Sequence, residues 1–251
     1  MRGNKSVLLL GDSFTEGHGA EPWFRRVAPQ IEQLNYQPIN GGLLGTGFLD
    51  WWRLEQVLSA NEVVLAKVVV IFISGDVDRG KWNFSKAQLD CLRSVNLCDG
   101  TETFVRLPPS NELGLWVEKT VRHDGNIKAR IKSALPATYA VYRFLLNFAA
   151  PPQTEFARLA INNLVEKYGR ENVLFIQLPQ KEELKGTILP NGLRARKFIL
   201  DVGAQYADGI LLCGLDESDF FVRDGHPNQQ GYSKIAECVG RIIMPFLTQI
   251  R

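Results

Sequence analysis

The chain has 251 residues, of which 45% are hydrophobic and 22% are charged. These values are typical of one globular α/β domain with a full core, or of one domain with a sizeable insertion. The 29 basic and 27 acidic residues leave a net charge of +2 and form no basic cluster, which argues against a nucleic-acid-binding protein. No apolar run is long enough to span a membrane. The sequence leaves the oligomeric state open.

The first residues and the cysteines give information on the cellular compartment of the protein. The Leu-rich start is too short for a signal peptide, so the chain as given is predicted to be cytoplasmic, or exported if a signal segment was trimmed from it. Cys91, Cys98, Cys213 and Cys238 form neither a Cys-x-x-Cys motif nor a metal-ligand pattern. We expect buried or incidental thiols, and a Cys91–Cys98 bridge only in an exported protein.

Apolar runs alternate with segments of helical periodicity along the chain. The run at 68–73 is continuously apolar and mostly β-branched, which is typical of a central strand in a parallel sheet. Strands that alternate with helices predict a three-layer α/β/α sandwich. The predicted strands are 7–10, 37–39, 68–73, 173–179 and 209–212, and the predicted helices are 22–35, 48–61, 154–168, 194–206 and a last one that ends near 244.

The segment 79–152 has the weakest pattern, with one helix predicted near 139–148. We interpret it as an insertion or lid within a single domain that covers 1–251, because long loop-rich segments in compact domains are often functional. A solvated excursion without a function is the alternative.

The first predicted strand ends abruptly in Gly11-Asp12-Ser13. Gly11 allows a sharp turn, which leaves Ser13 at the carboxyl end of the strand, where open α/β sheets bind ligands. Free backbone N–H groups at the start of the next helix are expected beside it. An ordinary helix N-cap is the alternative interpretation of Ser13.

A serine is a weak nucleophile until a base accepts its proton, and histidine is the usual base. His18 follows the first strand closely, His123 lies in a charged segment, and His226 lies in a polar loop before the last helix. Asp224 is two residues before His226, so the two side chains share one side of an extended loop. Asp224 can therefore orient the imidazole of His226. A plain Asp-Gly turn is the alternative.

The loop 40–47 is rich in glycine and follows the second predicted strand. It lacks the Gly-Lys-Ser/Thr of a phosphate-binding P-loop, which also follows a first strand. Glycines also let backbone N–H groups approach a substrate oxygen closely, and this is the use that we prefer here.

Taken in order, these motifs resemble those of the GDSL-type esterases and lipases, the SGNH hydrolase superfamily. The first motif is matched by Gly11-Asp12-Ser13, the second by Asn40, Gly42 and Gly45, and the last by Asp224, His226, Pro227, Asn228 and Gly231. The resemblance implies a five-stranded parallel sheet with the flavodoxin-like order 2-1-3-4-5 and an insertion after the third strand.

The resemblance also implies a mechanism. Ser13 would be the nucleophile, His226 the base and Asp224 its orienting group, with the backbone N–H groups of Ser13 and Gly42 as the oxyanion hole. Such enzymes hydrolyse or transfer a small acyl group through an acyl-serine intermediate, without a metal or an organic cofactor. The expected substrate is a small-molecule or glycan ester, and an O-acetyl group on a carbohydrate is one candidate. We expect the remaining polar residues of the motifs to bind the substrate; these are Asp12, Asn40 and Asp76.

Two positions depart from the family pattern. Many members place the aspartate three residues before the histidine, where this chain has Arg223, so Asp224 is the better candidate. The family's Gly-x-Asn-Asp motif corresponds to 75–78, and Val77 replaces the Asn that donates to the oxyanion; a shifted alignment puts Gly75 there instead. Loss of one donor costs about 10²–10³ in rate. A capping or turn role is the alternative for Asp76, and a non-catalytic binding module is the alternative function.

Overall fold

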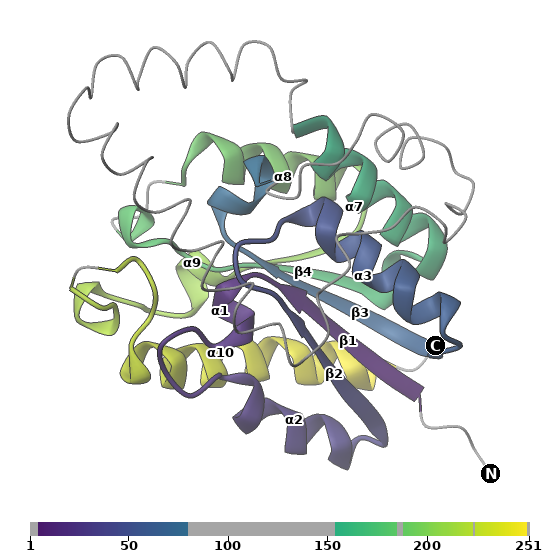
Figure 1. The fold of residues 1–251 in the computed structure, drawn as a ribbon, viewed down its shortest axis with the longest axis horizontal. Helices are drawn as coiled ribbons and strands as arrows, with labels where there is room; N and C mark the ends of the chain where they lie inside the picture. The colour runs from purple at the N-terminus through teal and green to yellow at the C-terminus, as the bar shows by residue number, and fades with distance from the viewer. Residues whose placement is uncertain (1–4, 80–153, 185–187, 223, 250–251) are drawn as a thin grey trace, which may run out of the picture. The chain divides into compact units, whose positions relative to one another are not determined.

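A computed structural model describes residues 5–79, 154–184, 188–222 and 224–249 (Figure 1). Its strands form one parallel sheet in the order β2-β1-β3-β4-β5. This order confirms the predicted fold class. The strands are β1 (Lys5–Gly11), β2 (Tyr36–Gly42), β3 (Leu65–Phe72), β4 (Val173–Gln177) and β5 (Gln205–Asp208).

Helices cover both faces of the sheet, with α2 and α10 on one face and α3, α7 and α8 on the other (Figure 1). Short helices lie in the connections between the longer elements. The helices are α1 (Ser13–Glu16), α2 (Phe24–Gln33), α3 (Phe48–Ala60), α7 (Thr154–Tyr168), α8 (Pro190–Asp201), α9 (Gly209–Leu212) and α10 (Gln229–Thr248), and the 3₁₀ turns are η1 (Ser74–Asp78), η2 (Arg170–Asn172), η3 (Lys181–Glu183) and η4 (Glu217–Asp219).

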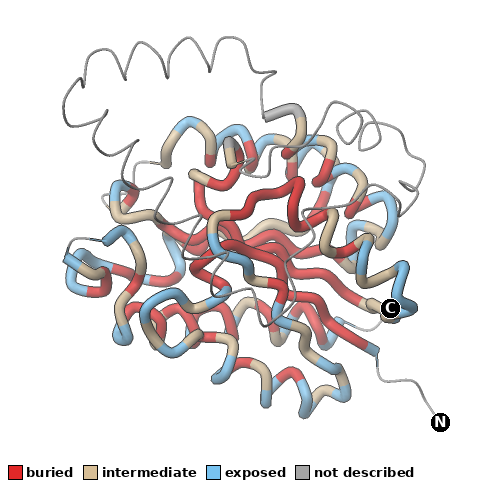
Figure 2. Tube along the Cα trace, in the orientation of Figure 1, coloured by how far each residue is buried: buried red, intermediate tan, exposed pale blue. Residues whose placement is uncertain are grey.

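The core follows the central strands, which Figure 2 shows as buried along almost their whole length. On the face covered by α2 and α10, Val7 and Leu9 pack in one cluster with Ile31 and Val239. Burial on both faces explains why β1, β3 and β4 are continuously apolar in sequence. The sheet is therefore a rigid base for the loops at its carboxyl edge.

The prediction of the last strand is wrong. We expected a strand at 209–212, whereas β5 is Gln205–Asp208 and the predicted residues form α9. Gly203 has a φ of 69° and ends α8 earlier than the periodicity suggested. Asp208 then caps α9 by accepting from the Leu211 N–H at 3.3 Å. The true strand is a half-buried edge strand, which is why its sequence is polar.

The expectation of incidental thiols is also wrong for one pair of cysteines. Cys213 and Cys238 form a disulfide between the end of α9 and the middle of α10. The 25-residue separation means that the bond closes the segment that carries Asp224 and His226.

The chain divides into two compact units, Met1–Asn83 with Gln153–Arg251, and Phe84–Pro152. Most of the predicted insertion at 79–152 lies outside the described residues. The predicted helix near 139–148, His123, Cys91 and Cys98 lie there too, as does Arg223. Within the described ranges, no helix is both long and apolar enough to cross a lipid bilayer.

Candidate active site

Ser13 begins α1 immediately after β1 ends, and its side chain is 1% exposed. Asp12 caps the helix by accepting from the Phe14 N–H at 2.9 Å. The Tyr232 hydroxyl from α10 donates to the Ser13 carbonyl at 3.2 Å and fixes the turn from below. The helix N-cap is thus Asp12, which leaves the Ser13 hydroxyl available for another partner.

His226 reaches the site from the loop before α10. This loop is braced by the short antiparallel bridge between Phe220 and Pro227 and by the Phe221 N–H, which donates to the His226 carbonyl at 3.0 Å. Asn228 caps α10 by accepting from the backbone N–H groups of its first turn. The loop therefore enters the helix in a fixed geometry and holds the imidazole at the sheet edge.

The structure brings Ser13, His226 and Asp224 together from opposite ends of the chain. The Ser13 Oγ lies 2.8 Å from the His226 Nε2, and the His226 Nδ1 is hydrogen bonded to the Asp224 Oδ1. This second bond places the imidazole proton on Nδ1, so that Nε2 accepts the serine proton. The hydrogen bond from His226 also lowers the pKa of the Asp224 carboxyl below its usual value. The same hydrogen bond therefore favours the ionised form of Asp224.

His18 is a third neighbour that the sequence analysis did not assign to the site. Its ring lies 4.7 Å from the His226 ring, centroid to centroid, at an angle of 52°. Ligand atoms of His18, Asp224 and His226 lie within 4.8 Å of one another, so a transition-metal cation could bind here. Such a cation would compete with the bond between Asp224 and His226, because it needs the same lone pairs.

A buried charge cluster lies behind Ser13. The Arg79 Nη1 donates to the Asp12 Oδ2 at 2.6 Å and to the Asp76 Oδ1 at 2.9 Å. Both carboxylates are 0% exposed. Burial and the neighbouring charge of Asp12 raise the pKa of Asp76 well above its usual value, although Arg79 opposes the shift. One guanidinium thus serves two carboxyl groups, and burial favours the neutral form of Asp76.

This burial does not support the expected contact of Asp12 and Asp76 with substrate. Their oxygens face Arg79 and the backbone: the Asp76 Oδ2 accepts from the Ile73 N–H at 2.9 Å. The capping role considered for Asp76 is therefore what the structure shows. The sequence analysis did not identify Arg79 because this residue stands at the start of the segment with the weakest pattern. The two acidic residues Asp12 and Asp76 could have indicated it, since carboxylates that are buried need a cation.

The predicted oxyanion donors are placed at the same edge. Gly42 ends β2 beside α1, and a Cβ there would lie 2.3 Å from the Glu16 N, so that only glycine allows this approach. The Gly42 N–H donates to the exposed Asn40 side chain at 2.9 Å. Among the described residues, the Ser13 N–H has no hydrogen-bond partner. Of the two predicted oxyanion donors, the Ser13 N–H is therefore free among the described residues, and the Gly42 N–H is bonded to Asn40.

The structure also places the positions of the third motif. The Val77 side chain is 2% exposed and belongs to the core. Gly75 lies in η1 and its N–H donates to the Gln180 Oε1 at 2.7 Å. Neither residue carries a side-chain donor, as the sequence analysis anticipated.

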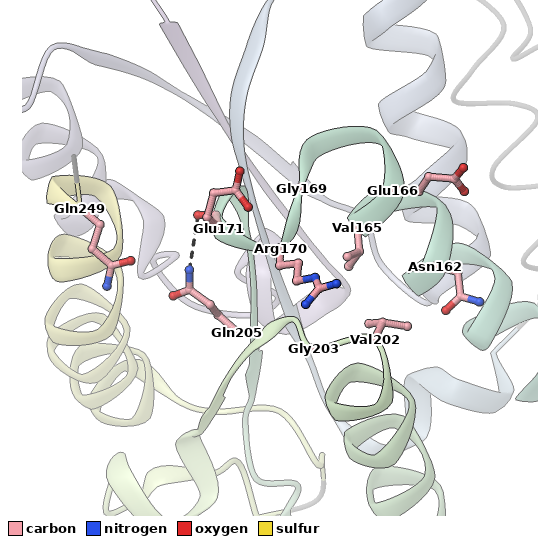
Figure 3. A pocket seen from close by; sticks show the side chains of 10 residues that line it. All are labelled: Asn162, Val165, Glu166, Gly169, Arg170, Glu171, Val202, Gly203, Gln205 and Gln249. Carbon is pink, nitrogen blue, oxygen red and sulfur yellow. Dashed lines mark hydrogen bonds between the residues drawn. The ribbon is translucent and has the colours of Figure 1, made fainter. Parts of the chain in front are cut away.

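A hollow also lies at another place in the described part of the chain. A cavity of about 810 Å³ opens at the amino ends of β4 and β5, between α7, η2 and the turn before β5 (Figure 3). Gln205 donates to the Glu171 carbonyl there at 3.3 Å, and Arg170 points into the space (Figure 3). This cavity is at the opposite edge of the sheet from Ser13 and holds no nucleophile with a base. We therefore assign the candidate site by its chemistry and not by its volume.

Comparison with known proteins identifies the fold. No family model matches the chain, and a search of curated protein sequences found no match. The solved structures that resemble it include three hydrolases with TM-scores of 0.50 to 0.52. An alpha/beta hydrolase, LAE5, from the metagenome of Lake Arreo has a TM-score of 0.52 at 12% identity, over 99% of each chain.

The other two have similar values. A variant of Axe2, an acetyl xylan esterase from Geobacillus stearothermophilus, has a TM-score of 0.51 at 12% identity, over 99% of this chain and 97% of that one. A lipase/acylhydrolase from Enterococcus faecalis has a TM-score of 0.50 at 14% identity, over 95% of each chain. The chain therefore has the fold of the SGNH hydrolases, as the order of its sequence motifs indicated.

Proposed function

We propose that the chain is a serine esterase that hydrolyses a small acyl ester through an acyl-serine intermediate. The observation that carries this proposal is the continuous hydrogen-bonded line from the Ser13 Oγ through the His226 imidazole to Asp224. The three residues come from two segments more than 200 positions apart, and the fold brings their side chains into hydrogen-bond distance. A non-catalytic binding module has no need of this alignment.

The geometry supports the following steps. The Ser13 Oγ attacks the ester carbonyl carbon while its proton moves to the His226 Nε2. The carbonyl π electrons move to the oxygen, which the Ser13 N–H faces. The intermediate collapses, the C–O bond to the alcohol breaks, and His226 returns the proton to the leaving oxygen. Water then attacks the acyl-serine with His226 again as the base, which releases the acid and restores Ser13.

Asp12 is a second acceptor for the Ser13 hydroxyl, at 3.3 Å. The shorter distance to His226 favours transfer to the imidazole. Arg79 strengthens this preference because it neutralises the same Asp12 oxygen, Oδ2, from the other side. The geometry therefore favours His226 over Asp12 as the acceptor of the Ser13 proton.

For the substrate, we propose an O-acetyl group on a carbohydrate. The similarity of the fold to an acetyl xylan esterase supports this class. We also propose that the protein works in an oxidising compartment, because the disulfide between Cys213 and Cys238 persists only there.

A fluorophosphonate probe tests the proposal, with intact mass as the readout. We expect one adduct on the wild type and none on Ser13→Ala. Ser218→Ala is the matched control, since its hydroxyl lies on η4 and, among the described residues, donates to Asp216 alone. Equal labelling of wild type and Ser13→Ala, or no labelling of the wild type, would contradict the proposal.

A further inference from the structure

His18 is a neighbour of the triad that the proposed reaction does not use. Its ring lies 4.7 Å from the His226 ring, and ligand atoms of His18, His226 and Asp224 lie within 4.8 Å of one another. His18 and Asp224 are exposed and His226 is partly buried, so dissolved ions reach these groups. Two imidazoles and a carboxylate form a ligand set that suits Zn²⁺, with a water as the fourth ligand.

The backbone holds His18 beside the nucleophile. Gly17 ends α1 in the left-handed region, with a φ of 94°, and the next residue turns back towards the serine. The His18 N–H donates to the Ser13 carbonyl at 3.1 Å. The Tyr232 hydroxyl lies 3.5 Å from the His18 carbonyl oxygen. The His18 side chain is thus exposed on a backbone that is anchored to the active site.

The loop of His18 also packs against the loop of His226. Gly19 has a φ of 81°, and a Cβ there would lie 3.1 Å from the ring of Phe221. The Phe221 N–H in turn donates to the His226 carbonyl at 3.0 Å. Ligand atoms around a tetrahedral Zn²⁺ lie about 3.3 Å apart, given bonds of about 2.0–2.1 Å. Rotation of the exposed side chains is therefore enough to complete the site.

Both ring nitrogens of His226 already have a role in the triad. Nε2 lies 2.8 Å from the Ser13 Oγ, and Nδ1 is hydrogen bonded to Asp224. A cation on Nε2 takes the lone pair that must accept the serine proton. A cation on Nδ1 takes the position of the proton there, so the neutral imidazole carries its proton on Nε2 instead. Either mode of binding prevents His226 from acting as the base.

We propose that His18, His226 and Asp224 form a site for Zn²⁺ and that its occupation inhibits the esterase. His18 is then a metal ligand that takes no part in hydrolysis. This inference rests on the proposed esterase function and deepens it, because it assigns a regulation to the same site. Mg²⁺ and Ca²⁺ prefer oxygen ligands and should not replace Zn²⁺ here.

Binding is measured by isothermal titration calorimetry with ZnCl₂, on protein without a histidine tag. His18→Phe keeps an aromatic ring beside His226 and removes the ligand nitrogens. The dissociation constant of Zn²⁺ should rise at least about 10-fold in this variant, since even the loss of a residue that only orients a ligand costs this much. Glu16→Gln is the matched control with unchanged affinity, because Glu16 is an exposed carboxylate on α1 outside the cluster.

Inhibition is measured as the ratio of the rates of p-nitrophenyl acetate hydrolysis without and with Zn²⁺, so that a change in the basal rate of a variant cancels. At saturation, wild type and Glu16→Gln should lose about 10²–10⁴-fold in rate, which is the contribution of a general base. EDTA should restore the rate, and Mg²⁺ should have no effect. His18→Phe should need at least about 10-fold more Zn²⁺ for the same loss.

Fluorophosphonate labelling separates this inference from the proposed function. If wild type is labelled but Zn²⁺ does not inhibit it, or inhibits His18→Phe at the same concentration, the inference is wrong and the esterase proposal stands. Activation of the wild type by Zn²⁺ would also overturn the inference. Absence of labelling in metal-free wild type would contradict the proposed function, and the inference with it.

Discussion

Two groups of carboxylates flank Ser13, and they differ in burial and in the direction of their pKa. The Asp224 side chain is 46% exposed, and its hydrogen bond from His226 lowers its pKa. Asp12 and Asp76 are fully buried beneath the serine and share Arg79, and the pKa of Asp76 is raised by burial. The hydrogen bond from His226 therefore favours the ionised form of the exposed carboxylate, whereas burial favours the neutral form of Asp76.

The difference indicates that the exposed carboxylate and the buried carboxyl groups have separate roles in the site. The exposed carboxylate orients a base that must gain and lose a proton in each turnover, so it remains accessible to water on a loop. The buried cluster holds the strand-to-helix turn and keeps the Asp12 charge neutralised. Substitutions on the exposed side should change activity without changing stability, and those on the buried side should change stability.

The largest expected effect is that of Asp224→Asn on activity. The amide cannot hold the imidazole proton on Nδ1, so Nε2 loses its role as acceptor, and we expect kcat to fall by up to about 10⁴-fold. The melting temperature should stay the same because the side chain is exposed and its hydrogen bonds are to His226 in the same loop. The rate of ester hydrolysis and the melting temperature, measured on the same preparation, check the two expectations. A clear loss of stability in Asp224→Asn would contradict the view that the exposed carboxylate affects activity alone.

Arg79→Met tests the buried side. It leaves Asp12 and Asp76 without a cation, and we expect a loss of about 2–5 kcal/mol in the free energy of unfolding at neutral pH. Urea denaturation measures the loss.

The double variant Arg79→Met with Asp76→Asn is its control. It removes one of the unpaired carboxyl groups and should recover part of the loss. If Arg79→Met were as stable as wild type, the guanidinium would not be needed to neutralise the buried carboxyl groups, and the prediction would be wrong.

Removal of the disulfide between Cys213 and Cys238 affects the segment that carries Asp224 and His226. Cys213→Ser with Cys238→Ser opens the segment around Asp224 and His226, and we expect a loss of about 2–4 kcal/mol in the free energy of unfolding. Equilibrium unfolding with and without a thiol reductant checks this: the reductant should destabilise the wild type and leave the variant unchanged. A wild type that does not respond to the reductant would contradict the prediction.

The last prediction concerns another buried carboxyl group, that of Asp50 on α3. Asp50 on α3 is 8% exposed, and burial raises its pKa to about 6, opposed by the hydrogen bond that it accepts from the Gly47 N–H. Between about pH 4 and pH 6 the unfolded chain has lost a proton that the folded chain keeps, so folding becomes less favourable as the pH rises. The total change is about 3 kcal/mol.

Asp50→Asn removes this titration. The difference in stability between pH 4 and pH 8 should therefore be smaller in the variant than in wild type, as measured by urea denaturation at both pH values. Identical pH dependence of the two proteins would contradict the assignment.

The sequence predicted those parts of the site that are formed by residues adjacent in the chain. Gly11-Asp12-Ser13 after a buried strand and Asp224 before His226 are patterns of neighbouring residues, and the ordered motifs also predicted the topology of the sheet. Ser13 and His226 meet as expected because parallel strands bring their carboxyl ends to one edge.

The supporting residues were not predictable in the same way. Arg79 enters through contacts between different loops, and His18 through the packing of two rings, neither of which leaves a local pattern. The last strand was misplaced because Gly203, which ends α8, was not recognised as a helix stop. The pairing of Cys213 with Cys238 depends on the fold itself.

The central claim is that Ser13 forms a covalent acyl intermediate. The most direct measurement is an acid quench of the protein during turnover of p-nitrophenyl acetate, followed by trypsin digestion and mass spectrometry of the peptide 6–25, which contains Ser13 as one of two serines. The account predicts an acetyl group on Ser13 in wild type, and none on this peptide in Ser13→Ala. Ester turnover without acetylation of Ser13, or acetylation retained in Ser13→Ala, would contradict it.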